Sequence, residues 1–155
     1  VNKVGASSTR SLRTMEEVFM TECAVLFFPA GLVSRKQNGL VRDLTWKKSF
    51  VTQAIDHKRM IQPVFIEGEN SPFFYNFANF RKKIGIKANI EMLFLPDEMF
   101  KAKKATIRIH YSKPFDTSIL DSRKTHKQWS DLIYQYIYSP EFMKGIPFEE
   151  YMKAF

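Results

Sequence analysis

Hydrophobic residues recur in four stretches of the chain at the three- and four-residue spacing that marks one face of a helix. We expect helices near residues 10–22, 46–58, 72–84 and 122–138, and a shorter one near 97–103. Ser71 followed by Pro72 strengthens the third, because a hydroxyl caps a helix and Pro suits its first position. Residues 141–155 carry a further short amphipathic piece.

Compact apolar runs bounded by Pro and Gly predict strands. Three strands are expected, at residues 24–28, 61–66 and 106–111. The last alternates apolar and polar residues, so one of its faces should be wet. Pro63 cannot donate to a sheet ladder and should lie at its strand's first turn or at a bulge. Residues 29–45 are expected to form a loop with a turn at Asn38-Gly39, and residues 90–95 stay open between helix and strand.

The alternation of helices and strands predicts an α/β fold with a mixed, largely parallel sheet flanked by helices. Three strands are few for a complete sheet, so we expect the domain to be incomplete. The chain has 155 residues, 45% of them hydrophobic, which is enough for a packed core. Cys23 is the single cysteine, which excludes an internal disulfide and suits a reducing compartment.

The formal net charge of +8 favours a polyanion or an anionic membrane surface as partner. Spread cations are also typical of an ordinary solvated face. No apolar run approaches the roughly eighteen residues of a membrane span. No spacing of His, Cys, Asp or Glu fits a metal site, and no phosphate loop or dinucleotide fingerprint occurs.

The first predicted strand runs directly into a loop with candidate chemistry. The loop comprises Phe28, Pro29, Ala30, Gly31, Leu32, Val33, Ser34, Arg35 and Lys36. Its proline fixes one dihedral and its glycine permits conformations closed to other residues, so the loop should have a defined shape. The hydroxyl and two cations at its end suit an anion such as a phosphate, which open α/β sheets bind at strand ends. An ordinary basic surface loop is the alternative.

Two histidines and one aromatic stripe have structural explanations. His57 lies at a helix end, where the helix dipole favours a cation, and His110 lies on the wet face of a strand. The stripe formed by Phe73, Phe77, Phe80 and Ile84 is expected to be core. Lining an apolar groove is the alternative role for that stripe.

Ordered blocks along the chain resemble the glycerolipid acyltransferase family of the lysophosphatidate-acyltransferase type, in particular its hemolysin-like, lyso-lipid O-acyltransferase branch. The family carries a block close to F-P-E-G-T-R-S after an apolar strand, where this chain has residues 28–34. A later family strand that contains Pro is similar to residues 61–66. The resemblance to this branch continues in the sequences of Arg42–Lys48, Asn70–Tyr75 and Gly85–Met92. The resemblance implies that residues 1–115 are the C-terminal portion of an acyltransferase domain, with residues 116–155 a helical extension packed on it.

Two departures from the family pattern matter. Ala30 stands where the family has Glu, and Leu32-Val33 where it has Thr-Arg, so Arg35 could supply the cation. The family's H-x-x-x-x-D block, whose His acts as general base, would lie upstream of these blocks. We therefore expect this chain to carry substrate-binding parts without the base. His126 and Asp131 fit the same letters, but residues five apart on a helix point about 140° from each other, so we interpret them as surface polar groups.

The resemblance implies transfer of a fatty acyl group from acyl-CoA or acyl-carrier protein to a hydroxyl of a lyso-lipid. It implies no cofactor and no metal, and a peripheral position on anionic lipid at the cytoplasmic face of the inner membrane. The implied site residues bind substrate and include no catalytic group: Phe28, Pro29, Gly31, Ser34, Arg35, Lys36, Pro63, Asn70 and Ser71. The loop cations would contact an anionic head group or the carrier's phosphates. We expect the chain alone to be inactive.

A basic, non-enzymatic module that binds nucleic acid or an anionic membrane surface is the alternative function. Cations and aromatic rings suit single-stranded nucleic acid. Here, however, most aromatic residues follow helical core periodicity, and no RNA-binding signature occurs. We therefore expect a lipid partner and no nucleic acid.

Overall fold

The computed structural model describes residues 16–154, except for the side chain of Lys104. The chain forms two compact units from interleaved stretches. Unit 1 contains the residues up to Pro29, Lys47–Pro63 and the residues from Ser112 onward, and unit 2 contains Ala30–Trp46 and Val64–Tyr111. The predicted division near residue 115 stays a prediction.

Unit 1 is built mainly of helices around an aromatic core. Its elements are α2 (Ser49–Asp56), a 3₁₀ turn at Thr117–Ile119, α5 (His126–Ile137), α6 (Pro140–Met143), α7 (Phe148–Tyr151) and a 3₁₀ turn at Met152–Ala154. A capping box starts α5, because Thr125 and Gln128 each accept the other's backbone N–H. Tyr136 of α5 is fully buried, with its ring 5.3 Å from those of Phe142 and Phe148. The helices predicted near 46–58 and 122–138 are confirmed with shorter bounds.

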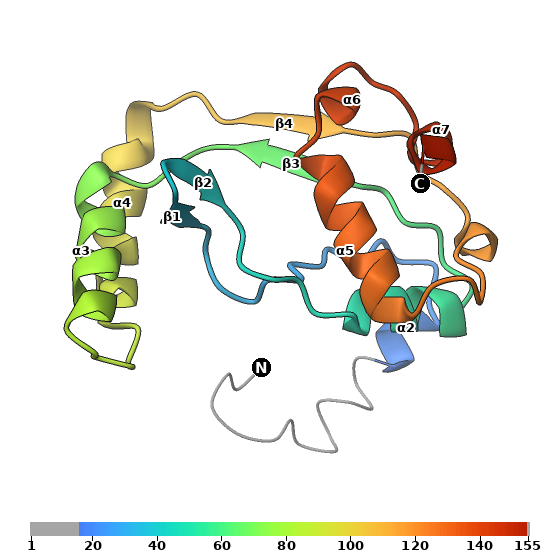
Figure 1. The fold of residues 1–155 in the computed structure, drawn as a ribbon, viewed down its shortest axis with the longest axis horizontal. Helices are drawn as coiled ribbons and strands as arrows, with labels where there is room; N and C mark the ends of the chain where they lie inside the picture. The colour runs from blue at the N-terminus through green and yellow to red at the C-terminus, as the bar shows by residue number, and fades with distance from the viewer. Residues whose placement is uncertain (1–15, 155) are drawn as a thin grey trace. The chain divides into compact units, whose positions relative to one another are not determined.

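Unit 2 combines two antiparallel strand pairs with a helical segment (Figure 1). Its strands are β1 (Arg35–Gln37), β2 (Leu40–Arg42), β3 (Val64–Glu67) and β4 (Arg108–Tyr111). Between β3 and β4 lie α3 (Pro72–Lys83), the 3₁₀ helix η1 (Ile90–Phe94), α4 (Leu95–Lys101) and the 3₁₀ helix η2 (Ala102–Lys104). Ser71 caps α3 by accepting the N–H of Phe74 at 3.4 Å. The predicted start of this helix is therefore confirmed.

The segment expected to be a loop contains the β1–β2 hairpin. Gln37 pairs with Leu40, so Asn38 and Gly39 form a two-residue turn, with φ values of 49° and 83°. Such turns favour Asn-Gly because both residues take a left-handed conformation. The turn prediction is confirmed, whereas the loop assignment is wrong where the two strands pair.

Residues 24–28, predicted to be a buried strand, pair with no strand in the described part of the chain. Leu26 is 73% and Phe28 is 64% exposed, while Phe27 packs against Phe50 with ring centroids 6.0 Å apart. An apolar run has the composition of a strand, but only a partner backbone can make it one. The prediction of a buried strand is wrong.

The largely parallel sheet is likewise not found among residues 16–154. Both sheets there are antiparallel pairs, so the fold is a mixture of helices and small antiparallel sheets. The helices between β3 and β4 suggested a parallel crossover, but β4 returns beside β3 in the opposite direction. Pro63 is buried directly before β3, where its carbonyl accepts the N–H of Ser112 at 3.0 Å.

Exposure in unit 2 reverses two predictions. Ile109 and Tyr111, on the apolar face of β4, are exposed, whereas His110 is partly buried beside Phe65. The aromatic stripe of α3 is also exposed, because this helix buries its other face instead. The buried residues of α3 are Phe74, Tyr75, Ala78 and Arg81. The core role predicted for the stripe is wrong.

The remaining predictions concern the chain's first helix and its apolar segments. Residues 16–19 are helical, and the earlier part of the helix predicted near 10–22 lies outside the described residues. The ambiguous residues 90–95 are largely the 3₁₀ helix η1. Within residues 16–154, no helix has both the length and the apolar character needed to cross a bilayer.

Candidate functional site

The predicted anion-binding loop begins in unit 1 and continues in unit 2. Phe28 and Pro29 belong to unit 1, and the carbonyl of Pro29 accepts the N–H of Lys47 at 3.1 Å. Gly31, in unit 2, has a φ of 65°, and a Cβ atom added there would meet nothing within 4 Å. The glycine is therefore needed for its backbone conformation, one closed to most other residues, and not for close packing.

The hydroxyl of this loop is held by an aspartate. Ser34 Oγ donates to Asp43 Oδ1 at 2.6 Å, and Trp46 Nε1 donates to Asp43 Oδ2 at 3.0 Å. Asp43 and Trp46 both come from the block that resembles the acyltransferase branch, although Asp43 was not among the predicted site residues. The three-residue spacing of Asp43 and Trp46 in that block was the sequence signal that could have identified Asp43. Asp43 thus fixes the two ends of the β1–β2 hairpin.

Arg35 lies in a buried cluster of three charged side chains. Its Nη2 is 2.6 Å from Glu91 Oε1, and Arg81 Nε is 2.7 Å from Glu91 Oε2. Glu91 is completely buried, and the two arginine side chains are almost so. Two guanidinium groups and one carboxylate leave one net positive charge. We call this set the Arg35–Glu91–Arg81 cluster.

Further donors of the cluster bind oxygens of neighbouring residues. Arg35 Nη1 donates to the carbonyl of Val33 at 2.9 Å, and Arg81 Nη2 donates to Asn89 Oδ1 at 3.0 Å. The cluster therefore ties β1 to α3 and η1. Glu91 was missed by the sequence prediction. Its place as the single carboxylate inside the apolar run 90–95 was the available signal, because a charge that is buried needs a partner.

Ser71 also belongs to a buried polar contact. Its N–H and Oγ donate to the two carboxylate oxygens of Glu98, at 2.5 and 2.7 Å. Burial alone would raise the pKa of Glu98, but these two bonds and Lys101 outweigh it and hold the pKa below its usual value. Ser71 therefore joins the start of α3 to α4.

Asn70 and Lys36 are placed by backbone contacts. The N–H of Asn70 donates to the hydroxyl of Tyr75 at 3.0 Å, and burial raises the pKa of that phenol. The carbonyl of Lys36 accepts from Asn79 Nδ2 of α3 at 3.3 Å, while the side chain of Lys36 is exposed. Lys36 is thus the predicted site cation whose side chain is presented to solvent.

The structure groups the predicted site residues by unit. Unit 2 holds Gly31, Ser34, Arg35, Lys36, Asn70 and Ser71, and unit 1 holds Phe28, Pro29 and Pro63. Within unit 2, α3 links the loop residues around β1 to Asn70 and Ser71. Ser71 caps the start of α3, and Arg81 in its last turn joins Arg35 in the cluster. A shared substrate site for all nine residues stays a prediction.

The histidines have structural contacts. His126 Nδ1 lies 2.9 Å from the hydroxyl of Thr52, whereas Asp131 pairs with Lys127. The two residues of this H-x-x-x-x-D match thus have separate partners, which agrees with the prediction that they are not a catalytic pair. His57 stacks on Phe19, with ring centroids 5.7 Å apart. Among the described residues, no group of three or more His, Cys, Asp or Glu side chains is arranged to hold a metal ion.

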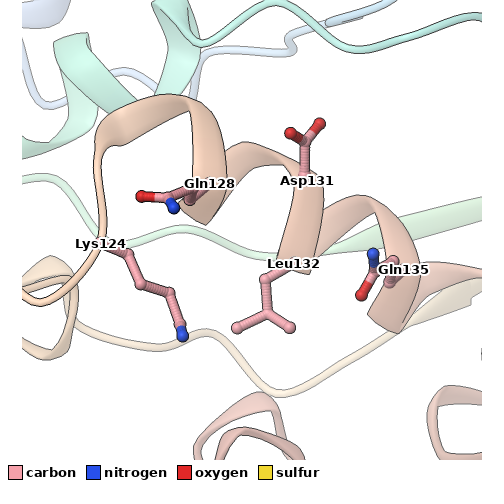
Figure 2. A pocket seen from close by; sticks show the side chains of 5 residues that line it. All are labelled: Lys124, Gln128, Asp131, Leu132 and Gln135. Carbon is pink, nitrogen blue, oxygen red and sulfur yellow. The ribbon is translucent and has the colours of Figure 1, made fainter. Parts of the chain in front are cut away.

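An open depression of about 300 Å³ lies in unit 1, and none of the predicted site residues lines it. Its lining comprises Lys124, Gln128, Asp131, Leu132 and Gln135 (Figure 2). In Figure 2, Lys124 and Leu132 lie on one side of α5 and Asp131 points to the other. This mainly polar helix surface offers no apolar groove for an acyl chain, so we assign it no substrate.

Comparison with known proteins agrees with the resemblance seen in the blocks. Residues 1–144 match a family model described as acyltransferase. A lyso-glycine lipid O-acyltransferase from Bacteroides thetaiotaomicron is 43% identical over 138 residues, which are 89% of this chain and 51% of that protein. The protein of the same name from Phocaeicola vulgatus is 42% identical over 138 residues, which are 89% of this chain and 50% of its own length.

The chain thus spans about half the length of the curated relatives it matches. No solved structure matches it. The family match extends over most of the chain, and it includes the glycine loop, the hairpin and the charged cluster of unit 2. The chain therefore belongs to this acyltransferase family.

Proposed function

We propose that this chain is the substrate-binding part of an enzyme that transfers a fatty acyl group from a thioester to a hydroxyl of a lyso-lipid. The observation that carries the proposal is the identity of 43% and 42%, over 89% of the chain, with two proteins named lyso-glycine lipid O-acyltransferase. A lyso-glycine lipid is accordingly the acceptor to test first. Acyl-CoA or acyl-carrier protein is the proposed donor, and neither a cofactor nor a metal takes part.

The binding role is assigned to the loop around β1. Gly31 shapes this loop, and the buried Arg35–Glu91–Arg81 cluster, which includes a loop residue, carries one net positive charge. Lys36 adds an exposed cation for an anionic head group or for the phosphates of the donor. The proposal places the general base outside these residues and the enzyme on the cytoplasmic face of the inner membrane, as a peripheral protein.

A chimera tests this function directly. In the Bacteroides thetaiotaomicron relative, the matching segment is replaced by this chain, and transfer from acyl-CoA to lyso-glycine lipid is measured. We expect product from the chimera and none from the isolated 155-residue chain. A folded chimera without activity contradicts the proposed function, and turnover by the isolated chain would place the base within it.

The role of Lys36 is tested in the same chimera. Lys36→Ala should raise the KM for one substrate by about tenfold, as expected for the loss of a charge-assisted contact, with kcat little changed. Lys113→Ala is the matched control, because Lys113 is also exposed but belongs to unit 1. Equal KM values in the two variants would remove Lys36 from the site.

A further inference from the structure

The α3 helix of unit 2 carries an apolar stripe that the protein leaves exposed. Phe73, Phe80 and Ile84 are 51%, 58% and 53% exposed. Phe77 lies on the same face and stacks on Phe73, with ring centroids 5.8 Å apart. Spacings of three and four residues put all four on one side of the helix, so the apolar side chains form a continuous stripe.

Contacts with η1 and α4 hold the stripe and its helix in place within unit 2. The ring of Phe94 in η1 meets those of Phe73 and Phe77 edge-on, at 5.3 and 5.4 Å. Ser71 at the start of α3 is bonded to Glu98 of α4. In Figure 1, α3 and α4 accordingly lie side by side. The exposed apolar residues of this segment also include Leu93, Met99 and Phe100.

Charge around the stripe is almost entirely positive. The exposed lysines of this segment are Lys82, Lys83, Lys87, Lys101 and Lys103. Of its carboxylates, Glu91 and Glu98 are buried, and the exposed Asp97 is paired with Lys101 at 2.7 Å. Lys101 is thus paired, and the other lysines leave the surface with an excess of positive charge beside its apolar side chains. This combination binds an anionic bilayer.

We propose that α3, η1 and α4 form a membrane-docking element, with the stripe of Phe73, Phe77, Phe80 and Ile84 inserted at the lipid interface. The long lysine side chains can lie along the apolar surface and reach lipid phosphates. A second copy of the chain fits this surface poorly, because the lysines of both copies would face one another. The inference rests on the proposed lyso-lipid acceptor, which itself resides in a membrane.

Vesicle binding by the full chain tests the element. Binding is measured by co-flotation with vesicles of phosphatidylglycerol and phosphatidylcholine in equal parts, and with vesicles of phosphatidylcholine alone. We expect binding to the anionic vesicles at least about tenfold tighter than to the neutral ones. Equal binding to both, or no binding to either, overturns the proposal.

Matched variants locate the binding surface. Phe80→Asn with Ile84→Asn should weaken binding to anionic vesicles by about tenfold or more, since two apolar side chains lose their lipid contact. Met60→Asn with Met143→Asn changes two similarly exposed residues of unit 1 and should leave binding unchanged. Equal losses in the two double variants overturn the assignment to α3.

A fluorophore sensitive to polarity reports insertion independently. Cys23 is the chain's single cysteine, is exposed and belongs to unit 1, so it is not part of the proposed docking element. A label there should stay in water when vesicles are added. A label at Ile84→Cys, in a Cys23→Ser background, should shift to the blue. If the emission of this label does not shift, the stripe does not enter the lipid and the proposal is overturned. The same holds if gel filtration shows a dimer and the stripe is buried against a second copy.

The docking proposal and the proposed function can fail separately. In the chimera, Phe80→Asn with Ile84→Asn should retain transfer to lyso-lipid dispersed in detergent and lose transfer to lyso-lipid in vesicles. Loss of both activities in a folded variant would refute a role restricted to docking. Loss of neither would refute docking while leaving acyl transfer established.

Discussion

Replacing Glu91 by Gln should strongly destabilise unit 2, because Glu91 is the single carboxylate between two buried guanidinium groups. The substitution keeps the side chain's shape and removes its charge. The ion pairs it breaks are 2.6 and 2.7 Å long, and the glutamate is fully buried. Arg35 and Arg81 would then face each other with no counter-charge.

The size of the effect follows from these contacts. Two unit charges about 4 Å apart attract by about 4 kcal/mol at the effective dielectric of a protein site, before desolvation is subtracted. Removing one partner of a buried pair costs about 3–5 kcal/mol, because the other charge remains buried. The amide of Gln can still accept one hydrogen bond, so we expect about 3 kcal/mol, the lower end of that range. With a urea m value of about 1.5 kcal/mol/M, the midpoint falls by about 2 M.

The two tryptophans allow each unit to be followed separately. Trp46 is buried in unit 2 and Trp129 in unit 1. Fluorotryptophan incorporation and fluorine NMR then give one resonance per unit during urea unfolding. In Glu91→Gln, the midpoint reported by Trp46 should fall by the stated amount, or unit 2 should already be unfolded without urea.

Glu67→Gln is the control, because Glu67 belongs to the same unit but its side chain is 48% exposed and lies 3.5 Å from Arg108. Its free energy of unfolding should change by less than about 1 kcal/mol. The double variant Glu91→Gln with Arg81→Gln should cost less than the sum of its single variants, because removing one guanidinium relieves the repulsion. If Glu91→Gln shifts the midpoint no more than Glu67→Gln does, the reasoning is refuted.

Three further predictions follow from other contacts. The folded-state pKa of Glu98 lies below its unfolded value. Its contribution to stability is therefore complete above the unfolded pKa and is lost as the pH falls through the folded pKa. In Glu98→Gln, this part of the loss of stability in acid, followed by the Trp46 signal, should vanish. Tyr136→Phe removes a hydroxyl that donates to the carbonyl of Ile146 at 2.7 Å, and should cost about 1–2 kcal/mol in urea unfolding of unit 1. Gly39→Ala should cost about 1–2 kcal/mol in unit 2, because φ is 83° there while a Cβ meets nothing within 4 Å. An unchanged acid profile, or midpoints equal to those of the parent chain, would contradict these expectations.

Local chemistry in the sequence determined several elements without help from the rest of the chain. Ser71-Pro72 started α3 where predicted, since the cap bond and the fixed φ of Pro act within one turn. Asn38-Gly39 marked the turn of the hairpin because few other residue pairs take two positive φ values. The ordered blocks predicted the family without any tertiary information, because their residue types and their order can be read directly along the chain.

Tertiary structure alone decided which apolar residues are covered and which charges meet. Residues 24–28 and the α3 stripe have the composition of core, but burial depends on a partner surface that composition does not contain. Glu91 meets Arg35 across 56 positions of sequence, so no local pattern could pair them. The predicted role of Arg35 in binding an anion rested on its place after a glycine loop. Only the fold shows that its charge is shared with a buried carboxylate.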